Sequence, residues 1–293
     1  MIRVILIAIL ATGSLFSYSQ PISYENSQGE VHLAGSITPS DLNSGHYNEW
    51  YEESYSKFEL SDKSTNWSSS LEDAQVKIFL GTWCGDSKKW VPRFVHLWEE
   101  LGLDPNQLEF TALHDGVDKY KQGPEAEEKG YQVHRVPTFI FSREGEEFAR
   151  IVESPVSDLE TDLAQIALGY PSEPNYRAAT YMMELLANNT DDEIDAQLKE
   201  HLNTVYRMAH QSKELNTLGY VYLRSGRIRE AVTTFMFNTY YFPYEPNVYD
   251  SYAEALEADG QLDQALENYE KALALDPGNE RTKEKVMALQ GDQ

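Results

Sequence analysis

The sequence predicts an α/β domain, with a mixed central sheet flanked by helices, followed by an all-α region of helical repeats. Two patterns predict this order. In the first part of the chain, short β-rich segments alternate with one-sided apolar helical patterns, whereas the last part repeats itself every 34 residues at helical spacing. The chain has 293 residues, 41% of them hydrophobic and 12% aromatic, so it can form two domains with cores of their own.

The chain is strongly acidic. It carries 24 lysines and arginines against 48 aspartates and glutamates, a formal net charge of −24. Phosphate backbones and anionic membrane surfaces are bound by clustered lysine and arginine. We therefore expect no nucleic acid partner. The acidic residues would form either solvated helix faces or an acidic recognition surface, and the charge does not choose between them.

The first 19 residues have the pattern of a secretory signal peptide. Arg3 precedes an apolar run over residues 4–16, and the small Ser17 and Ser19 suit cleavage just after them. The run is too short to span a membrane, and no cysteine lies near the cleavage point to carry a lipid anchor. We expect an exported protein with no membrane anchor, periplasmic or extracellular, and bacterial by analogy.

An N-terminal extension, residues 20–65, is polar and contains several tyrosines. Two interpretations stay open for it: an added strand and helix packed on the following domain, or a partly ordered leader.

Cys84 is the only cysteine, so the chain cannot form an internal disulfide. A lone cysteine is most often a small buried hydrophobic residue, but the surroundings here favour chemistry. The β-rich segment Gln75–Gly81 leads directly to Cys84, and an amphipathic helical pattern follows. The unpaired amides and dipole of a helix start favour a negative charge and so promote the reactive thiolate. The apolar face of this helix comprises Val91, Phe94, Val95, Trp98 and Leu101.

Two motifs lie about fifty residues apart. The first, Trp83–Lys88, reads Trp-Cys-Gly-Asp-Ser-Lys and is followed by Pro92 inside the helical pattern. The second, Val133–Phe141, holds Val-Pro-Thr-Phe and leads through a glycine turn into a hairpin pattern. With a predicted strand over residues 108–113 between them, the two motifs resemble the active-site and cis-proline segments of the thioredoxin superfamily.

The resemblance covers residues 66–170, which would form a thioredoxin-like domain closed by a helix around residues 159–167. It implies that Pro137 is a cis residue and that the backbone of Val136 pairs with an extended substrate peptide. The catalytic positions it implies are Cys84 and Ser87. The substrate-binding positions it implies are Trp83, Gly85, Asp86, Val136 and Pro137.

Two departures from the family pattern change the expected chemistry. The usual second cysteine is replaced by Ser87, whose hydroxyl cannot resolve a mixed disulfide. The buried acid of thioredoxin proper would fall at Ile78. Asp86 opposes and Lys88 favours a thiolate at Cys84, so the sign of their combined effect is open. A monothiol site suits isomerisation or deglutathionylation better than net oxidation or reduction.

Other polar residues flank the expected site. His114 and Asp115 close the preceding strand, where they would either form a base beside Cys84 or simply cap the strand end. His134 and Arg135, beside the proline loop, are expected at the rim of a substrate groove. We expect no cofactor and no metal, because no metal-ligand spacing or phosphate loop is evident.

A proline-rich break at residues 171–174 begins a helical connector that extends to residue 211. We expect one helix over Tyr176–Asn188. Thr190 and Glu193 form a capping-box pattern, which predicts a second helix from there through Met208.

The last segments repeat at a period of 34 and resemble tetratricopeptide repeats, with units at residues 212–245 and 246–279 and a capping helix at 280–293. Small residues such as Gly219 would let paired helices approach closely. The repeats would either dock a partner protein or brace the first domain. The aromatic cluster Tyr240, Tyr241, Phe242 and Tyr244 would line a groove or a domain interface. The repeating positions are Leu215, Leu218, Gly219, Tyr222, Ala231, Phe235 and Pro243, matched by Tyr249, Tyr252, Ala253, Leu256, Ala265, Tyr269 and Pro277.

Two functional hypotheses follow. In the first, Cys84 exchanges disulfides with exported protein or peptide substrates while the repeats bind a partner protein. In the second, the protein is a redox-silent scaffold that holds peptides. The reactivity of Cys84 discriminates between them.

Overall fold

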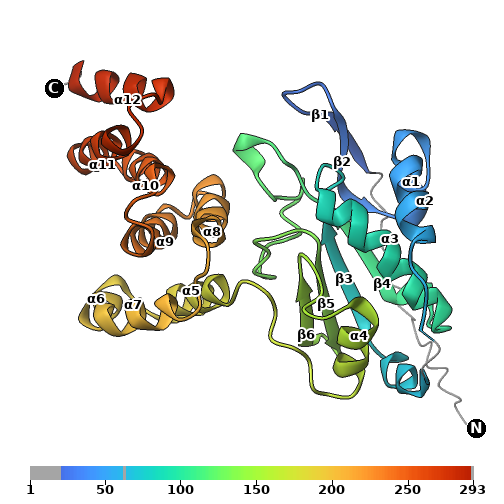
Figure 1. Cartoon of the computed structure of the whole chain (residues 1–293). Coiled ribbons are helices and arrows are strands. Elements are labelled where there is room, and N and C mark those ends of the chain that lie inside the picture. The colour runs from blue at the N-terminus through green and yellow to red at the C-terminus, as the bar shows by residue number, and fades with distance from the viewer. Residues whose placement is uncertain (1–20, 62–63, 292–293) are drawn as a thin grey trace, which may run out of the picture.

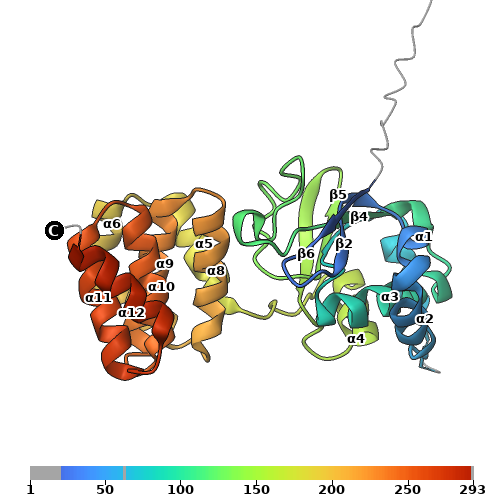
Figure 2. The same ribbon diagram turned by 90° about the horizontal axis from the view of Figure 1, so that it is seen from above.

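The computed structural model describes residues 21–61 and 64–291; the predicted signal peptide, residues 1–19, lies outside the described residues. The chain forms two lobes side by side (Figures 1 and 2). We call the lobe around the sheet, residues 21–61 and 64–170, the cysteine domain, and the lobe of residues 171–291 the helical region. None of the described helices is long and apolar enough to cross a membrane.

The cysteine domain is built on a six-stranded mixed sheet in the order β1-β2-β4-β3-β5-β6. The central pair, β3 and β4, is parallel, with Ile78 opposite Phe110, and every other neighbouring pair is antiparallel. A parallel pair needs a crossover connection, and the helix that follows Cys84 supplies it. The strands are β1 (Ile22–Glu25), β2 (Val31–Ile37), β3 (Gln75–Leu80), β4 (Leu108–Ala112), β5 (Thr138–Arg143) and β6 (Glu146–Val152).

Both faces of the sheet are buried, and alternate side chains of each strand serve different clusters. On β3, Ile78 packs into the main core with Phe94 and Trp98 of α3, whereas the adjacent Phe79 packs on the opposite face with Val136. The helices of the main core are α1, α2, α3 and α4, while the opposite face is covered by the long segment 113–137 (Figure 1). The helices of this domain are α1 (Pro39–Leu42), α2 (Asn48–Ser56), α3 (Gly85–Glu100) and α4 (Leu159–Ala167), and the 3-10 turns are η1 (Gly45–Tyr47), η2 (Asn66–Leu71), η3 (Pro105–Gln107) and η4 (Val117–Lys119).

The N-terminal extension is an added strand and helix, the first of the two interpretations. Strand β2 pairs with β4, where Gly35 lies opposite Ala112, and thereby widens the central sheet. Buried Leu42 and Tyr51, from α1 and α2, join the main core. The extension is therefore an integral part of the cysteine domain.

The helical region begins with three helices that precede the repeats. The capping box at Thr190 is present, with Oγ1 accepting from the backbone N–H of Glu193. The expected single helix from there through Met208 is wrong, because the backbone leaves helical geometry at Gln197 and two short helices result. These first helices are α5 (Arg177–Asn188), α6 (Asp191–Ala196) and α7 (Leu198–Tyr206).

Two helix pairs and a last helix follow, as the period of 34 predicted. Gly219 of α8 faces Phe235 of α9 so closely that an added Cβ would lie 2.5 Å from the phenylalanine ring. This contact explains the small residue at that repeat position. The helices are α8 (Ser212–Arg224), α9 (Ile228–Tyr241), α10 (Pro246–Ala258), α11 (Leu262–Leu275) and α12 (Glu280–Gly291).

The aromatic cluster does not lie between the two lobes. Tyr241 packs within the helical region, where its hydroxyl donates to the carbonyl of Leu202 in α7. Tyr240 and Tyr244 are exposed.

Helix α8 joins the two lobes. Gln122 Nε2 donates to the carbonyl of Arg224 at 2.9 Å, and Arg135 Nη2 donates to the carbonyl of Lys213 at 2.9 Å. The guanidinium of Arg135 also lies 4.3 Å from the ring centroid of Tyr176, just before α5. The first repeat is thus tied to the cysteine domain near both ends of α8.

Candidate functional site

Cys84 is the N-cap residue of α3. Its carbonyl accepts the first helical hydrogen bond, from Lys88 N at 3.0 Å, and its side chain is partly exposed. The thiol Sγ donates to the carbonyl oxygen of Val136 at 3.1 Å. The Val136–Pro137 peptide bond is cis. The structure therefore brings the two sequence motifs into direct contact, and Cys84 lies at the positive end of a helix dipole.

The residues that flank Cys84 differ in what they offer to a partner. Gly85 is exposed and Asp86 is partly exposed, so both are accessible beside the thiol. Ser87 is buried, and its Oγ accepts a hydrogen bond from Gly81 N at 3.1 Å. The Ser87 hydroxyl therefore holds the end of β3 to the start of α3.

Trp83, the residue before Cys84, is fixed to the end of strand β4. Its Nε1 donates to the carbonyl of Leu113 at 2.8 Å, and its ring centroid lies 6.5 Å from that of Tyr120. The indole is partly exposed. The indole therefore supports the motif and also lines the surface next to Cys84.

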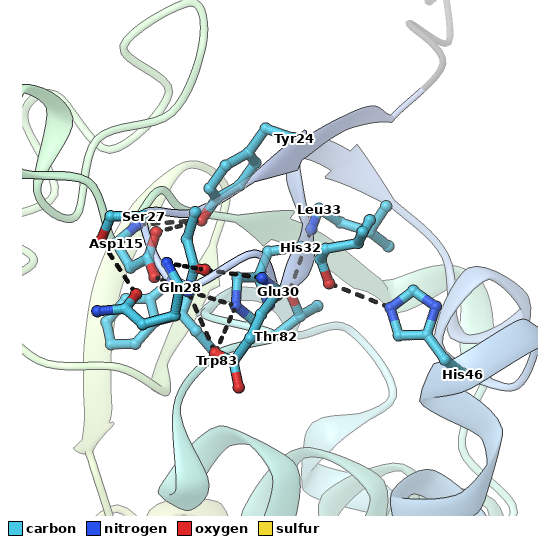
Figure 3. A network of polar contacts seen from close by, with 12 residues as sticks. Tyr24, Ser27, Gln28, Glu30, His32, Leu33, His46, Thr82, Trp83 and Asp115 are labelled. Carbon is cyan, nitrogen blue, oxygen red and sulfur yellow. Dashed lines mark hydrogen bonds and ion pairs between the residues drawn. The ribbon is translucent and has the colours of Figure 1, made fainter.

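The N-terminal hairpin braces the residue before Trp83 (Figure 3). Buried Thr82 accepts from Leu33 N at 3.1 Å, and its Oγ1 lies 3.3 Å from Nδ1 of buried His32. His32 Nε2 lies 3.2 Å from Asn26 Nδ2, which donates to Asp115 at 3.1 Å. Sequence reasoning missed this network, because its members are far apart in the chain.

His114 and Asp115 take part in the same hairpin contacts. The ring of His114 packs on Tyr24 with centroids 4.4 Å apart, and Asp115 accepts from the Tyr24 hydroxyl at 3.0 Å. Burial lowers the pKa of His114, and the positive charge of Lys119 lowers it further. These contacts support the strand-end interpretation rather than a base beside Cys84.

The expected groove rim at His134 and Arg135 is wrong. His134 is only 2% exposed, and burial lowers its pKa to about 3, so the imidazole is neutral in the folded protein. Arg135 pairs with Glu153 at 3.1 Å and reaches Lys213 of the helical region. Both side chains point toward the helical region, because the His134 ring meets that of Tyr176 with centroids 5.9 Å apart and Arg135 reaches Lys213.

Two residues that sequence reasoning missed lie next to Trp83. Lys121 is 4% exposed, its Nζ lies 5.8 Å from the Trp83 ring centroid, and it donates to the hydroxyl of Tyr120. Tyr120 and Lys121 belong to the loop after β4, which has no periodicity to indicate burial. The one signal in the sequence that could have pointed to them is weak: a Tyr-Lys pair in a polar loop.

A hollow of about 350 Å³ extends from this site to the first repeat. Its walls come from the loop after β4 and from α8, so it connects the surroundings of Trp83 with the repeats. The lining residues are Asp115, Val117, Tyr120, Asn216, Thr217, Tyr220 and Arg224.

Within the described residues, no group of three or more His, Cys, Asp or Glu side chains is arranged to hold a metal ion. Around Cys84 the structure places a partly exposed thiol, the backbone carbonyl of Val136 and, on the other side of Trp83, the buried Lys121.

Comparison with known families identifies the end of the chain. The tetratricopeptide repeat family matches residues 246–288, which cover α10, α11 and most of α12. The match agrees with the helix pairs seen in the structure, and such repeats are protein interaction modules. No curated protein matches the chain.

Proposed function

We propose that this protein is an exported, monothiol member of the thioredoxin superfamily that exchanges disulfides with partner proteins through Cys84, and that its tetratricopeptide repeats dock such a partner. The arrangement of β4-β3-β5-β6, with parallel β3 and β4 and a helix that begins at the cysteine, supports the fold assignment. The N-terminal strands and the long loop 113–137 flank this arrangement.

The observation that carries the proposal is the 3.1 Å contact between Cys84 Sγ and the Val136 carbonyl. In the resting protein the Cys84 thiol donates a hydrogen bond to this carbonyl. Once the sulfur is ionised or joined in a disulfide, that proton is gone and Val136 O becomes a free acceptor. A backbone N–H of an extended peptide would then satisfy the acceptor, in the manner of an added β-strand.

The chemistry needs no internal second thiol. The Cys84 thiolate attacks one sulfur of a client disulfide, forms a mixed disulfide, and releases the client's other sulfur as a thiolate. A second thiolate, from the same client or from a small thiol, then attacks the client sulfur of the mixed disulfide and restores the Cys84 thiolate. The protein is neither oxidised nor reduced over the cycle. The net reaction is isomerisation when the second thiolate belongs to the client, and transfer of a thiol group when it comes from a small thiol.

Trapping of the mixed disulfide tests the proposal. The purified full chain is mixed with a peptide that carries an activated disulfide, and the adduct on Cys84 is measured by mass spectrometry, with Cys84→Ser as the blank. We expect the native chain to form the adduct faster than the chain unfolded in urea, because the helix start and the peptide-binding backbone exist only when folded. A thiol reagent of similar size but without a peptide serves as the control for simple exposure.

Equal or slower adduct formation in the native chain would contradict the exchange function. The redox-silent scaffold would then be the better account, with peptide binding at Val136 and at the repeats as its activity.

Export rests on residues 1–19 and is tested separately. Expression of the full chain in a bacterium should yield a processed protein outside the cytoplasm with an N-terminus near residue 20. Recovery of unprocessed cytoplasmic protein would contradict it.

A further inference from the structure

Three consecutive carbonyls of the proline loop, those of residues 135–137, each accept a hydrogen bond. The first accepts from the Thr138 hydroxyl at 2.7 Å, and the last accepts from Glu153 N at 2.7 Å. The middle one, of Val136, accepts from Cys84 Sγ at 3.1 Å. The loop therefore holds its two outer carbonyls in internal hydrogen bonds and leaves the middle one to the thiol.

Glu153, the residue after β6, holds both ends of this loop. Its backbone N–H binds the last carbonyl, and its carboxylate accepts from Nη1 of Arg135, the first residue of the loop, at 3.1 Å. Because the proline ring fixes φ at Pro137, the direction of the Val136 carbonyl follows from how the ends of the loop are held. The pair of Arg135 and Glu153 therefore closes a ring of contacts around the acceptor that meets Cys84.

This arrangement is kept against two physical costs. Glu153 has φ +64°, a left-handed backbone that non-glycine residues rarely adopt. The Nε–H of Arg135 is buried without an acceptor, although both of its Nη groups are hydrogen-bonded. Strained backbone concentrates at functional sites, and an unpaired buried donor calls for an explanation other than stability. The pair is therefore a candidate for a role in the site.

The same guanidinium joins the loop to the first repeat. Arg135 Nη2 donates to the carbonyl of Lys213 in α8 at 2.9 Å, and the planar group lies 4.3 Å from the ring centroid of Tyr176. The side chains of Arg135 and Glu153 are 11% and 18% exposed, so solvent screens their pairing weakly. A planar fork can hold a carboxylate and a carbonyl at the same time, which a lysine ammonium does less well.

We propose that Arg135 is a positioning residue for the exchange reaction. It holds Glu153 and α8 so that the Val136 carbonyl points at the thiol and, once the sulfur is in a disulfide, at the backbone of the client. The assignment rests on the proposed function, because it gives that carbonyl the task of aligning the client. Since Arg135 acts only through the direction of this acceptor, its loss should slow exchange with peptides and spare exchange with peptide-free disulfides.

Replacement of the fork tests the assignment. The rate of adduct formation on Cys84 is measured in the full chain with two probes, a peptide that carries an activated disulfide and a reagent of similar size without a peptide. We expect Arg135→Met to lower the rate with the peptide about tenfold and to leave the rate with the peptide-free reagent unchanged. A role in stability alone would change both rates or neither.

Arg150→Met is the matched control. Arg150 lies in β6, pairs with Glu147 at 2.5 Å and donates to the carbonyl of Tyr131 at 3.2 Å, so it likewise joins a carboxylate and a carbonyl. Its side chain is 16% exposed, close to the value for Arg135. We expect Arg150→Met to lose stability to a similar extent, measured by urea unfolding, and to keep the preference of the natural chain for the peptide.

A second measurement needs no client. Because Cys84 is the only cysteine of the chain, its S–H stretching band in the infrared reports the hydrogen bond to Val136 directly. We expect Arg135→Met to move this band toward that of a free thiol and to broaden it, and Arg150→Met to leave it in place. Arg135→Lys, which keeps the charge without the fork, should shift the band less in the same direction, and it decides the matter if Arg135→Met does not fold.

The two measurements separate the two proposals. If the natural chain forms the peptide adduct, an unchanged peptide preference or an unmoved S–H band in the Arg135 variants would overturn the role of Arg135 and keep the exchange function. If the natural chain forms no adduct, the exchange function falls, and the S–H band alone decides whether Arg135 directs the Val136 carbonyl.

Discussion

The indole of Trp83 lies directly over Gly81, three residues before Cys84, and an added Cβ at residue 81 would come within 2.5 Å of Trp83 Cε2. Contacts this short force the larger group to move. The last residue of the strand segment therefore decides where the tryptophan of the motif can lie.

We expect Gly81→Ala to displace the indole and break its hydrogen bond to Leu113. The loss of stability should be about 1 to 3 kcal/mol, the usual range for overpacking a buried site. Denaturant unfolding followed by tryptophan fluorescence measures it. Gly116→Ala, where an added Cβ meets nothing within 4 Å, is the matched control. Equal stability of both variants would mean that the indole has room to move.

Acid should destabilise the protein through His134. The pKa of His134 is about 3 in the folded protein, below the ordinary 6.5. The stability that goes with the neutral imidazole is therefore fully present above pH 6.5. It is lost as the pH falls toward 3, because the unfolded chain binds this proton more readily. Between about pH 6.5 and 4 this one group accounts for on the order of 3 kcal/mol. We expect His134→Phe to reduce the loss of stability over this range by a comparable amount, measured as urea midpoints at several pH values.

The exposed His210 provides the control for His134. His210→Gln should retain the full acid sensitivity of the natural chain. The same sensitivity in His134→Phe would show that other groups control acid unfolding.

Lys121 should affect the pH dependence of stability in the alkaline range rather than in acid. Because its folded pKa is about 7 against an ordinary 10.5, the unfolded chain binds more protons between these values, and stability from this group rises with pH across that window. We expect Lys121→Met to be more stable than the natural chain at pH 7, by on the order of 4 kcal/mol before the lost Tyr120 contact is counted. The difference should shrink as the pH approaches 10.5.

Calorimetry of the two chains across that range measures the difference, with Lys119→Met as the reference for an exposed lysine. A constant difference at every pH would mean that Lys121 is not buried as a charge.

Gly219→Ala should destabilise the first repeat. The new methyl group would lie 2.5 Å from Phe235, so the helices α8 and α9 must separate, at about 1 to 3 kcal/mol. Hydrogen exchange should speed up in these two helices. Gly278→Ala, whose nearest neighbour to an added Cβ is 3.5 Å away, controls for the glycine change itself, and a like effect there would contradict the packing explanation.

The parts of the fold that sequence predicted well depend on short-range patterns. The strand before Cys84, the helix after it and the repeats of period 34 follow from alternation, helical spacing and small residues such as Gly219. The added strand β2 depends on pairing with the distant strand β4, and the capping-box pattern does not mark the helix break at Gln197. The sequence left the added strand as one of two interpretations, and its capping-box pattern predicted a helix that continues through Gln197.

The same distinction applies to the candidate site. The contact of Cys84 with Val136 joins two motifs that each have a recognisable pattern. Lys121 lies in polar loop sequence and His134 beside the proline of the second motif. No pattern indicates burial at either position, and segments far apart in the chain form their surroundings. Pattern reasoning placed His134 at a surface rim because it could not show that Tyr176 of the helical region packs against its side chain.

The two hydrogen bonds that fix α8, from Gln122 and Arg135, have a kinetic consequence for any client held by the repeats. A client bound along this face would not search solution for Cys84, because the hollow between Tyr120 and Tyr220 leads from one lobe to the other. Its disulfide would meet the thiol at an effective concentration set by the span of that short path, on the order of millimolar for a flexible segment. Even a weakly nucleophilic thiol would then react selectively, because binding to the repeats rather than the reactivity of the thiol would determine which client reacts.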